Sequence, residues 1–288
     1  MALLVVQAAF AAGAVEGKIA LSPPAAGGEG VSPWALAMAR MVGAALFFHA
    51  LGPFLRKGAT ERVRLGVGDH ARLAGLAMLG IAVNQALFLL GLRITTAFVA
   101  ALLAGTIPVF TAVVTVAMGR ESPSLRLWAG VAASFAGVAW LVGVRSVDVG
   151  AMVIAANCLS YSLYLVLSGP TIQRLGAIRM ITWVFTWGAV LFAPIGVPAL
   201  IADAPTWTPR GMSLVAFFVL VPSIVAYSAN AWALGRTTAT VVAIYVNLQP
   251  LLAALLQWVQ LGQRVTGRMV VASGMIFAGL WLVATRRK

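Results

Sequence analysis

The sequence predicts an all-α integral membrane protein, with ten transmembrane helices built from two inverted five-helix repeats around a central cavity. Three observations predict this fold class. Hydrophobic residues make up 61% of the 288 residues and charged residues only 9%, whereas soluble domains carry about 25% charged residues. Apolar segments long enough to cross a bilayer follow one another along the whole chain. One sequence pattern also occurs twice.

The apolar segments give the expected spans, because a helix needs about 20 predominantly apolar residues to cross a bilayer. These spans are residues 2–21, 33–55, 72–92, 95–118, 125–144, 149–169, 179–201, 212–234, 237–259 and 268–285. The loops between them are short, so we expect neighbouring helices to run antiparallel.

The repeated pattern covers residues 94–143 and 236–285, which align without gaps at an offset of 142 residues. The identical pairs are Thr95/Thr237, Thr96/Thr238, Ala97/Ala239, Val99/Val241, Ala101/Ala243, Pro108/Pro250, Ala112/Ala254, Arg126/Arg268, Phe135/Phe277, Ala136/Ala278 and Gly137/Gly279. Each copy belongs to a unit of five spans, so we expect two domains, residues 1–146 and 147–288. Because five is odd, the second unit must cross the membrane in the opposite direction to the first. A site between such units can open to either side.

The basic residues predict the orientation, since Lys and Arg are enriched in cytoplasmic loops. With both termini in the cytoplasm, thirteen of them are cytoplasmic: Arg56, Lys57, Arg62, Arg64, Arg72, Arg120, Arg126, Arg174, Arg179, Arg236, Arg286, Arg287 and Lys288. Five are external: Arg93, Arg145, Arg210, Arg264 and Arg268. The net charge of +13 is therefore spread over loops, which argues against a nucleic-acid partner, because a nucleic-acid domain gathers its basic residues on one soluble face.

Pro108 and Pro250 lie at equivalent mid-span positions. Proline removes a backbone donor and clashes with the preceding turn, so we expect each helix to kink there. The kinks either shape helices that move during gating or serve packing alone.

Polar and aromatic side chains within five spans are candidates for substrate binding, since such groups in hydrocarbon usually face the bundle interior. They are Asn84 and Gln85; Asn157, Tyr161 and Tyr164; Trp183 and Trp187; Tyr227 and Asn230, with Ser223; and Tyr245, Asn247 and Gln249. Amides, phenols and aromatic faces suit a zwitterionic, partly apolar solute. The alternative is that they only hold neighbouring helices together.

Glu16, Lys18 and Arg40 are charged residues inside predicted spans. Glu16 and Arg40 are expected at similar depth in an antiparallel hairpin, so we predict that they form an ion pair. The pair either joins two helices or binds substrate, with Glu16 facing a proton or an amino group and Arg40 a carboxylate. Only Glu16 and His49 could take up a proton in the membrane, and His49 is expected to pack. This sparse set favours facilitated transport over proton antiport.

The two copies carry motifs that point to a family. The first reads Thr95-Thr96-Ala97, Pro108, Gly119-Arg120-Glu121 and Phe135-Ala136-Gly137, and the second reads Thr237-Thr238-Ala239, Pro250, Gly262-Gln263-Arg264 and Phe277-Ala278-Gly279. The whole chain thereby resembles the EamA-type drug/metabolite transporter superfamily, with Gln263 standing where the family tends to have glutamate. Its closing segment from Trp281 to Arg287 is also similar to that of YddG-type bacterial amino-acid exporters.

The resemblance implies a multi-pass secondary transporter of the bacterial inner membrane. It would export aromatic and other neutral amino acids and related metabolites by alternating access, with facilitated uniport as the expected mode. The alternative is a proton-coupled exporter of drugs or of metabolites and cations, from the same superfamily. The expected partners are a small-molecule substrate and the lipid bilayer, and the oligomeric state is not predicted.

Functions outside the class of carriers find little support in the sequence. The chain has no H-E-x-x-H, G-x-S-x-G or phosphate-binding G-x-x-x-x-G-K-[ST] motif, so neither an enzyme nor ATP hydrolysis is expected. Cys158 is the single cysteine, so we expect no metal, and no cofactor or catalytic residue is predicted. A membrane scaffold or a channel would also be compatible with ten apolar spans, but inverted repeats favour a carrier.

Overall fold

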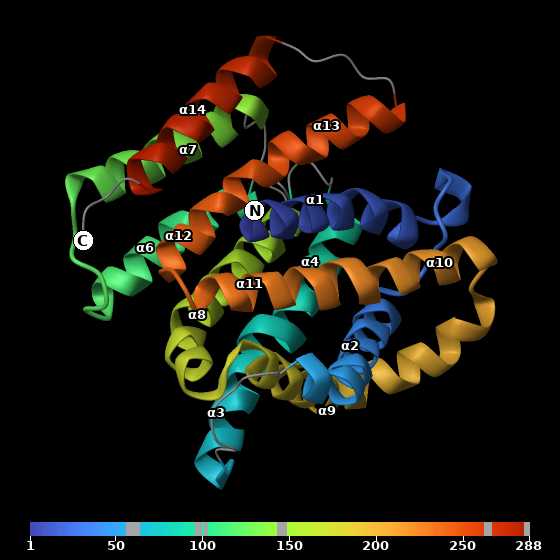
Figure 1. Ribbon diagram of the computed structural model, residues 1–288. Helices are drawn as coiled ribbons and strands as arrows, with labels where there is room; N and C mark the ends of the chain where they lie inside the picture. Colours follow the sequence, from blue (N-terminus) through green and yellow to red (C-terminus); the bar gives the residue numbers. More distant parts are fainter. Residues whose placement is uncertain (56–63, 96–99, 101–102, 143–148, 262–266, 285–288) are drawn as a thin grey trace.

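The computed structural model describes residues 1–55, 64–95, 100, 103–142, 149–261 and 267–284. Within these residues every regular element is a helix, which confirms the all-α class (Figure 1). The first half contains α1 (Ala2–Leu21), α2 (Pro33–Leu55), α3 (Val67–Ala77), α4 (Val83–Ile94), α6 (Ile107–Ala117) and α7 (Leu125–Val142). The second half contains α8 (Val149–Leu175), α9 (Ala177–Asp203), α10 (Pro209–Phe218), α11 (Ala226–Leu234), α12 (Ala239–Ile244), α13 (Gln249–Leu261) and α14 (Gly267–Ala284). Thr96, Ala97, the Gly262-Gln263-Arg264 motif and the basic residues Arg56, Lys57, Arg62, Arg145, Arg286, Arg287 and Lys288 lie outside the described residues.

In the part of the chain that the structure describes, six helical stretches are long and apolar enough to cross a membrane. They are Ala2–Leu21, Pro33–Leu51, Val67–Ile94, Met152–Leu175, Ala177–Thr206 and Pro209–Leu234. The expected spans 95–118 and 237–259 contain shorter apolar helices, Ile107–Ala117 and Ala239–Ala253, and α7 and α14 fall on the expected fifth and tenth spans. The multi-pass membrane fold is confirmed, and the count of ten spans stays a prediction.

The third and eighth spans each change from α-helix to π-helix and back. The π segment η2 (Met78–Ala82) separates α3 from α4, and η4 (Val219–Val225) separates α10 from α11. Adding the repeat offset of 142 to residues 78–82 gives 220–224, which lies inside η4. The two halves therefore carry a π segment at the same place. Such segments disturb the regular hydrogen bonding of an α-helix and occur frequently at functional sites.

Pro108 and Pro250 lie in the first turns of α6 and α13, and the helix geometry changes just before each of them. Pro108 lies in the first turn of α6, directly after a turn at residues 105–106. Pro250 is the second residue of α13, directly after the 3₁₀ segment η5 (Tyr245–Leu248). Proline is well tolerated there because the N–H that it lacks would have no intrahelical partner in the first turn. Both equivalent spans are thus interrupted just before the proline.

Helices at equivalent positions of the two halves pack together, α2 against α9 and α7 against α14 (Figure 1). The rings of Phe48 in α2 and Phe185 in α9 lie 5.9 Å apart and are both fully buried. The backbone N–H of Ser32, just before α2, donates to the Asp203 carboxylate at the end of α9 (2.8 Å), so α2 and α9 run antiparallel. Antiparallel equivalent helices are what an inverted repeat requires.

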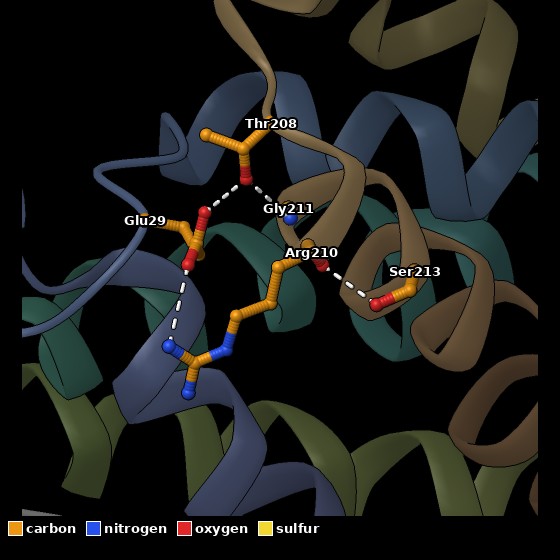
Figure 2. A network of polar contacts seen from close by, with 5 residues as sticks. All are labelled: Glu29, Thr208, Arg210, Gly211 and Ser213. Carbon is orange, nitrogen blue, oxygen red and sulfur yellow. Dashed lines mark hydrogen bonds and ion pairs between the residues drawn. The ribbon is translucent and has the colours of Figure 1, made fainter.

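Two ion pairs lie at opposite ends of the α2–α9 pair. At one end Glu29, in the loop before α2, pairs with Arg210 in the first turn of α10 (3.5 Å) and accepts a hydrogen bond from the Thr208 hydroxyl (Figure 2). At the other end Arg174, in the last turn of α8, pairs with Asp69 in the first turn of α3. We refer to these two places as the Glu29 end and the Asp69 end.

Candidate functional site

A cavity of about 80 Å³ lies between the two halves. Its lining residues are Phe10, Gly13, Ala14, Arg40, Asn84, Gln85, Phe88, Ala100, Ala104 and Ile107 from the first half, and Ile154, Asn157, Cys158, Tyr161, Phe218, Pro222, Tyr227 and Gln249 from the second. Six of these were predicted to bind substrate: Asn84, Gln85, Asn157, Tyr161, Tyr227 and Gln249. Small-molecule pockets usually measure roughly 300–1,000 Å³, so this cavity must widen before it can hold most solutes.

Gln85 and Tyr227 meet across the two halves. They occupy equivalent positions, 142 residues apart, and the side-chain N–H of Gln85 donates to the Tyr227 hydroxyl (3.0 Å). That hydroxyl donates in turn to the carbonyl of Gly80 in η2 (2.8 Å). A Cβ at Gly80 would lie only 2.3 Å from the Tyr164 ring, so a larger residue does not fit there. The first π segment thus provides both a free carbonyl and a close surface for the tyrosines of the second half.

Asn84 and Asn157 form a reciprocal pair between α4 and α8. The Asn84 side chain donates to the Asn157 backbone carbonyl (3.2 Å), and the Asn157 side chain donates to the Asn84 backbone carbonyl (2.7 Å). Nearby, the Ser160 hydroxyl donates to the carbonyl of Leu79 in η2 (2.7 Å). Asn84 and Asn157 therefore line the cavity and also hold two helices together.

Arg40 is buried in α2 and has different neighbours from those predicted. Its side chain is 2% exposed, its Nε donates to the Ser223 hydroxyl (3.0 Å), and its guanidinium lies 5.2 Å from the centre of the Phe218 ring. Glu16 is not among these contacts of Arg40, so the predicted ion pair between Glu16 and Arg40 is not formed. Arg40 instead crosses from α2 to η4, where Ser223 lies.

Lys18 caps a helix. Its ammonium donates to the backbone carbonyls of Leu92 (3.1 Å), Arg93 (3.4 Å) and Thr95 (2.7 Å), at the C-terminal end of α4. The last carbonyls of a helix have no intrahelical partner and carry partial negative charge, which a lysine ammonium balances. The contacts explain how a lysine is accommodated near the end of an apolar span.

The tyrosines of the sixth and eighth spans form one aromatic cluster, although only two of them line the cavity. The two that line it are Tyr161 and Tyr227, and Phe10 contacts both rings edge-on, with its ring centre 6.5 Å from that of Tyr161 and 5.9 Å from that of Tyr227. Tyr164 stacks on Tyr161 behind the cavity wall (6.0 Å), and the Asn230 side chain donates to the Tyr161 hydroxyl (3.1 Å). Tyr164 and Asn230 thus support the lining and do not belong to it.

Trp183 and Trp187 lie outside this cavity and surround the two histidines of the chain. Trp183 makes edge-on contacts with His49 (5.7 Å) and His70 (4.7 Å), and the Trp187 indole N–H donates to His70 (3.3 Å). His49 also hydrogen-bonds the Thr186 hydroxyl (2.8 Å). These aromatic residues therefore join α2, α3 and α9.

The three candidates of the ninth span separate in the structure. Gln249 reaches the cavity and donates to Gln7 of α1 (2.8 Å). Asn247 is fully buried in η5, and neither its side-chain oxygen nor its side-chain nitrogen has a hydrogen-bond partner among the described residues. Tyr245 lines a second, larger cavity of about 660 Å³ at the start of α1, whose wall includes the exposed aromatic residues Trp232, Phe277 and Trp281. Exposed apolar side chains on a membrane protein suit contact with lipid, so we assign the site to the smaller, more polar cavity.

Sequence reasoning missed the small and apolar part of the lining. Gly13 and Ala14 lie in α1, where a Cβ at Gly13 would be 3.7 Å from Pro222 of η4. Phe10, Phe88 and Phe218 supply the apolar walls. In an apolar helix such residues are common, so only the tertiary structure identifies which of them face the cavity.

Comparison with known proteins agrees with this architecture. The EamA-like transporter family matches residues 1–143 and 148–285. An uncharacterized transporter of Archaeoglobus fulgidus is 25% identical over 226 residues, which is 76% of this chain and 78% of the relative. The uncharacterized transporter YdfC of Bacillus subtilis is 25% identical over 265 residues, 88% of this chain and 84% of the relative. The WAT1-related protein At3g18200 of Arabidopsis thaliana is 24% identical over 317 residues, 98% of this chain and 80% of the relative.

This chain can also be superposed on a solved crystal structure, with a TM-score of 0.74 and 18% sequence identity. The superposition covers 100% of this chain and 99% of the other. At this identity the likeness concerns the fold alone. The family match extends over nearly the whole chain, and two of the relatives are named as transporters. The protein is therefore a membrane transporter that belongs to the EamA-like transporter family.

Proposed function

We propose that this transporter exports amino acids, aromatic and other neutral ones, and related metabolites from the cytoplasm across a bacterial inner membrane. Both termini lie in the cytoplasm, and export proceeds by facilitated uniport with alternating access. The observation that carries the proposal is the cavity between the halves, where the equivalent residues Gln85 and Tyr227 meet. A site between inverted repeats is reached from one side or the other as the halves exchange conformations.

The helix geometry around the cavity supports alternating access. Both halves have a π segment in the third span of the repeat and a helix break before the proline of the fourth. Irregular backbone in a membrane is tolerated where it is buried in protein or lines a cavity. We infer that residues 1–146 and 147–288 act as two units that bend at these matched places and thereby widen the cavity on one side at a time.

The chemistry of the lining supports an amino-acid substrate and uniport. Amides, phenols and one guanidinium offer hydrogen bonds to a polar backbone, while phenylalanine rings suit an apolar side chain. None of the described lining residues is a carboxylic acid or a histidine. A solute can therefore bind there without an obligatory proton uptake by the lining itself.

Counterflow in proteoliposomes tests the proposal. Four solutes are tested in turn: L-alanine, L-phenylalanine, a polyamine and a nucleobase. For each one, vesicles are preloaded with the unlabelled solute, and uptake of the same solute in labelled form is compared with its uptake into empty vesicles. We expect stimulation by internal amino acid and little response to an imposed pH gradient. Stimulation confined to the polyamine or the nucleobase would reject the substrate, and a strong response to the pH gradient would reject uniport.

A matched pair of variants connects this transport to the cavity. Ala104→Phe places a large ring in the cavity lining and should abolish counterflow. Val190→Phe adds a ring to an α9 side chain that is 55% exposed, and should leave counterflow unchanged. Equal activity of both variants would place the binding site elsewhere.

A further inference from the structure

Arg40 is a buried cation at the wall of the cavity. Only 2% of its surface is exposed, and its described contacts, the Ser223 hydroxyl and the Phe218 ring, are uncharged. The Ser223 hydroxyl donates to the Phe218 carbonyl (2.8 Å), so it can accept from Arg40 but supplies no negative charge. Removing a guanidinium from water is costly unless an anion is nearby, and charged residues inside membranes usually have a functional role.

Gln85 lines the same cavity and contributes an acceptor. The Tyr227 hydroxyl donates to Gly80, so it must accept from Gln85, and this assigns the Gln85 nitrogen to the tyrosine. The remaining amide oxygen, Oε1, is buried and has no hydrogen-bond partner in the described part of the chain. A buried acceptor left unpaired is destabilising, and a donor on a bound solute would remove this cost.

These two groups are complementary to the two charges of an α-amino acid. We propose that Arg40 binds the carboxylate of the substrate and Gln85 Oε1 accepts from its ammonium group, with Phe10, Phe88 and Phe218 around the side chain. This inference rests on the proposed function and deepens it, because it assigns the two charged groups of the substrate to two named residues. It also explains why the lining carries one cation: the anion that balances Arg40 arrives with the substrate.

Three probes with the same side chain separate the two contacts. L-Phenylalanine carries both charged groups, phenethylamine lacks the carboxylate, and 3-phenylpropanoate lacks the ammonium; L-alanine, ethylamine and propanoate form a second series with a small side chain. Each probe competes with counterflow of the labelled parent amino acid, in wild-type protein and in the variants Arg40→Gln, Arg40→Lys and Gln85→Leu.

Each variant should weaken a different subset of the probes. Loss of a hydrogen bond to a charged group lowers affinity by about tenfold to a hundredfold. We expect Arg40→Gln to weaken binding of the amino acid and of the carboxylate probe by this amount and to leave binding of the amine unchanged. Arg40→Lys should recover part of this loss. Gln85→Leu should weaken binding of the amino acid and of the amine and leave binding of the carboxylate probe unchanged.

Several results would overturn the assignment. If Arg40→Gln weakens all three probes equally, or none of them, Arg40 does not bind the carboxylate. The same outcome for Gln85→Leu rejects the ammonium contact. The size-exclusion profile and the unfolding temperature of each variant show whether it is folded. If Arg40→Gln is misfolded, the affinities of the three probes for Arg40→Lys decide whether Arg40 binds the carboxylate. Absence of counterflow of either amino acid by wild-type protein overturns the proposed function together with this inference, whereas normal wild-type counterflow with uniform losses in the variants overturns the inference alone.

Discussion

At both ends of the α2–α9 pair a carboxylate of the first half meets an arginine of the second half. The positions are equivalent in the repeat: Asp69 corresponds to residue 211, next to Arg210, and Arg174 corresponds to residue 32, close to Glu29. The signs are exchanged, however. Both positions, the one before the second helix of a unit and the one in the first turn of its third helix, are acidic in the first half and basic in the second.

Because of this difference in sign, each half is electrostatically complementary to the other half and not to a second copy of itself. Two copies of the first half packed in the same way would bring Glu29 toward another carboxylate, and two copies of the second half would bring arginines together. Like charges at an interface disfavour the wrong partner. The comparison therefore indicates how a duplicated chain favours the pairing of unlike halves.

The two ends differ in what surrounds the ion pair. At the Glu29 end the network in Figure 2 also includes the Thr208 hydroxyl, which accepts from the Gly211 N–H (2.9 Å) and caps α10. Asp203 accepts there from Ser32 and from the Trp207 indole (2.7 Å). At the other end, among the described residues, Asp69 accepts a second hydrogen bond only from Gly66, at the start of its own helix (3.1 Å). We infer that the Asp69 end separates at lower cost.

The largest test of this difference is Asp203→Ala. It removes the acceptor of two hydrogen bonds, from the Ser32 backbone and the Trp207 indole, and should lower the free energy of unfolding by about 2–3 kcal/mol. Denaturant unfolding in detergent measures the change. Asp203→Asn keeps an oxygen acceptor and should lose less than half as much. If Asp203→Ala unfolds like wild type, the contacts of Asp203 do not explain the difference between the ends.

Lys18→Met should have the next largest effect. The substitution keeps the apolar stem but leaves three carbonyls at the end of α4 without their donor, at a cost of about 1–2 kcal/mol. Lys18→Arg is the control, because it retains a cation of similar reach. Amide hydrogen exchange at residues 92–95 should rise in Lys18→Met alone; faster exchange in both variants would mean that the charge is not what stabilises this helix end.

The sequence predicts the frame of the molecule well, because hydropathy and the 142-residue offset depend on the chain alone. The apolar spans and the duplication are visible in it, as are the amides of α4 and the amides and tyrosines of α8 and α11. The π segments are not visible, since η2 and η4 interrupt continuous apolar runs without a proline at η2. Their hydrogen bonds follow from packing, as the approach of Tyr164 to Gly80 illustrates.

The partners of charged and aromatic residues were harder to predict than their presence in the spans. Lys18 finds its acceptors more than 70 residues later in the chain, and Arg40 finds Ser223 183 residues later. Trp183 and Trp187 share a helix face, but the rotation of α9 turns this face toward His70 and not toward the predicted binding site. Helix rotation is set by tertiary packing, which periodicity does not contain.

The smallest expected effect is that of the ion pairs themselves. The arginine side chains are 61% exposed at the Glu29 end and 47% exposed at the Asp69 end, so solvent and salt screen both pairs. Double-mutant cycles with glutamine or asparagine in place of each partner should give a coupling of about 0.2–1 kcal/mol at either end, falling as salt increases. Equal couplings would mean that the hydrogen bonds of Asp203 and Thr208, and not the ion pair, make the Glu29 end the stronger one. A coupling well above this range at the Asp69 end would reverse the comparison, because the end with fewer hydrogen bonds would then be the one held more tightly.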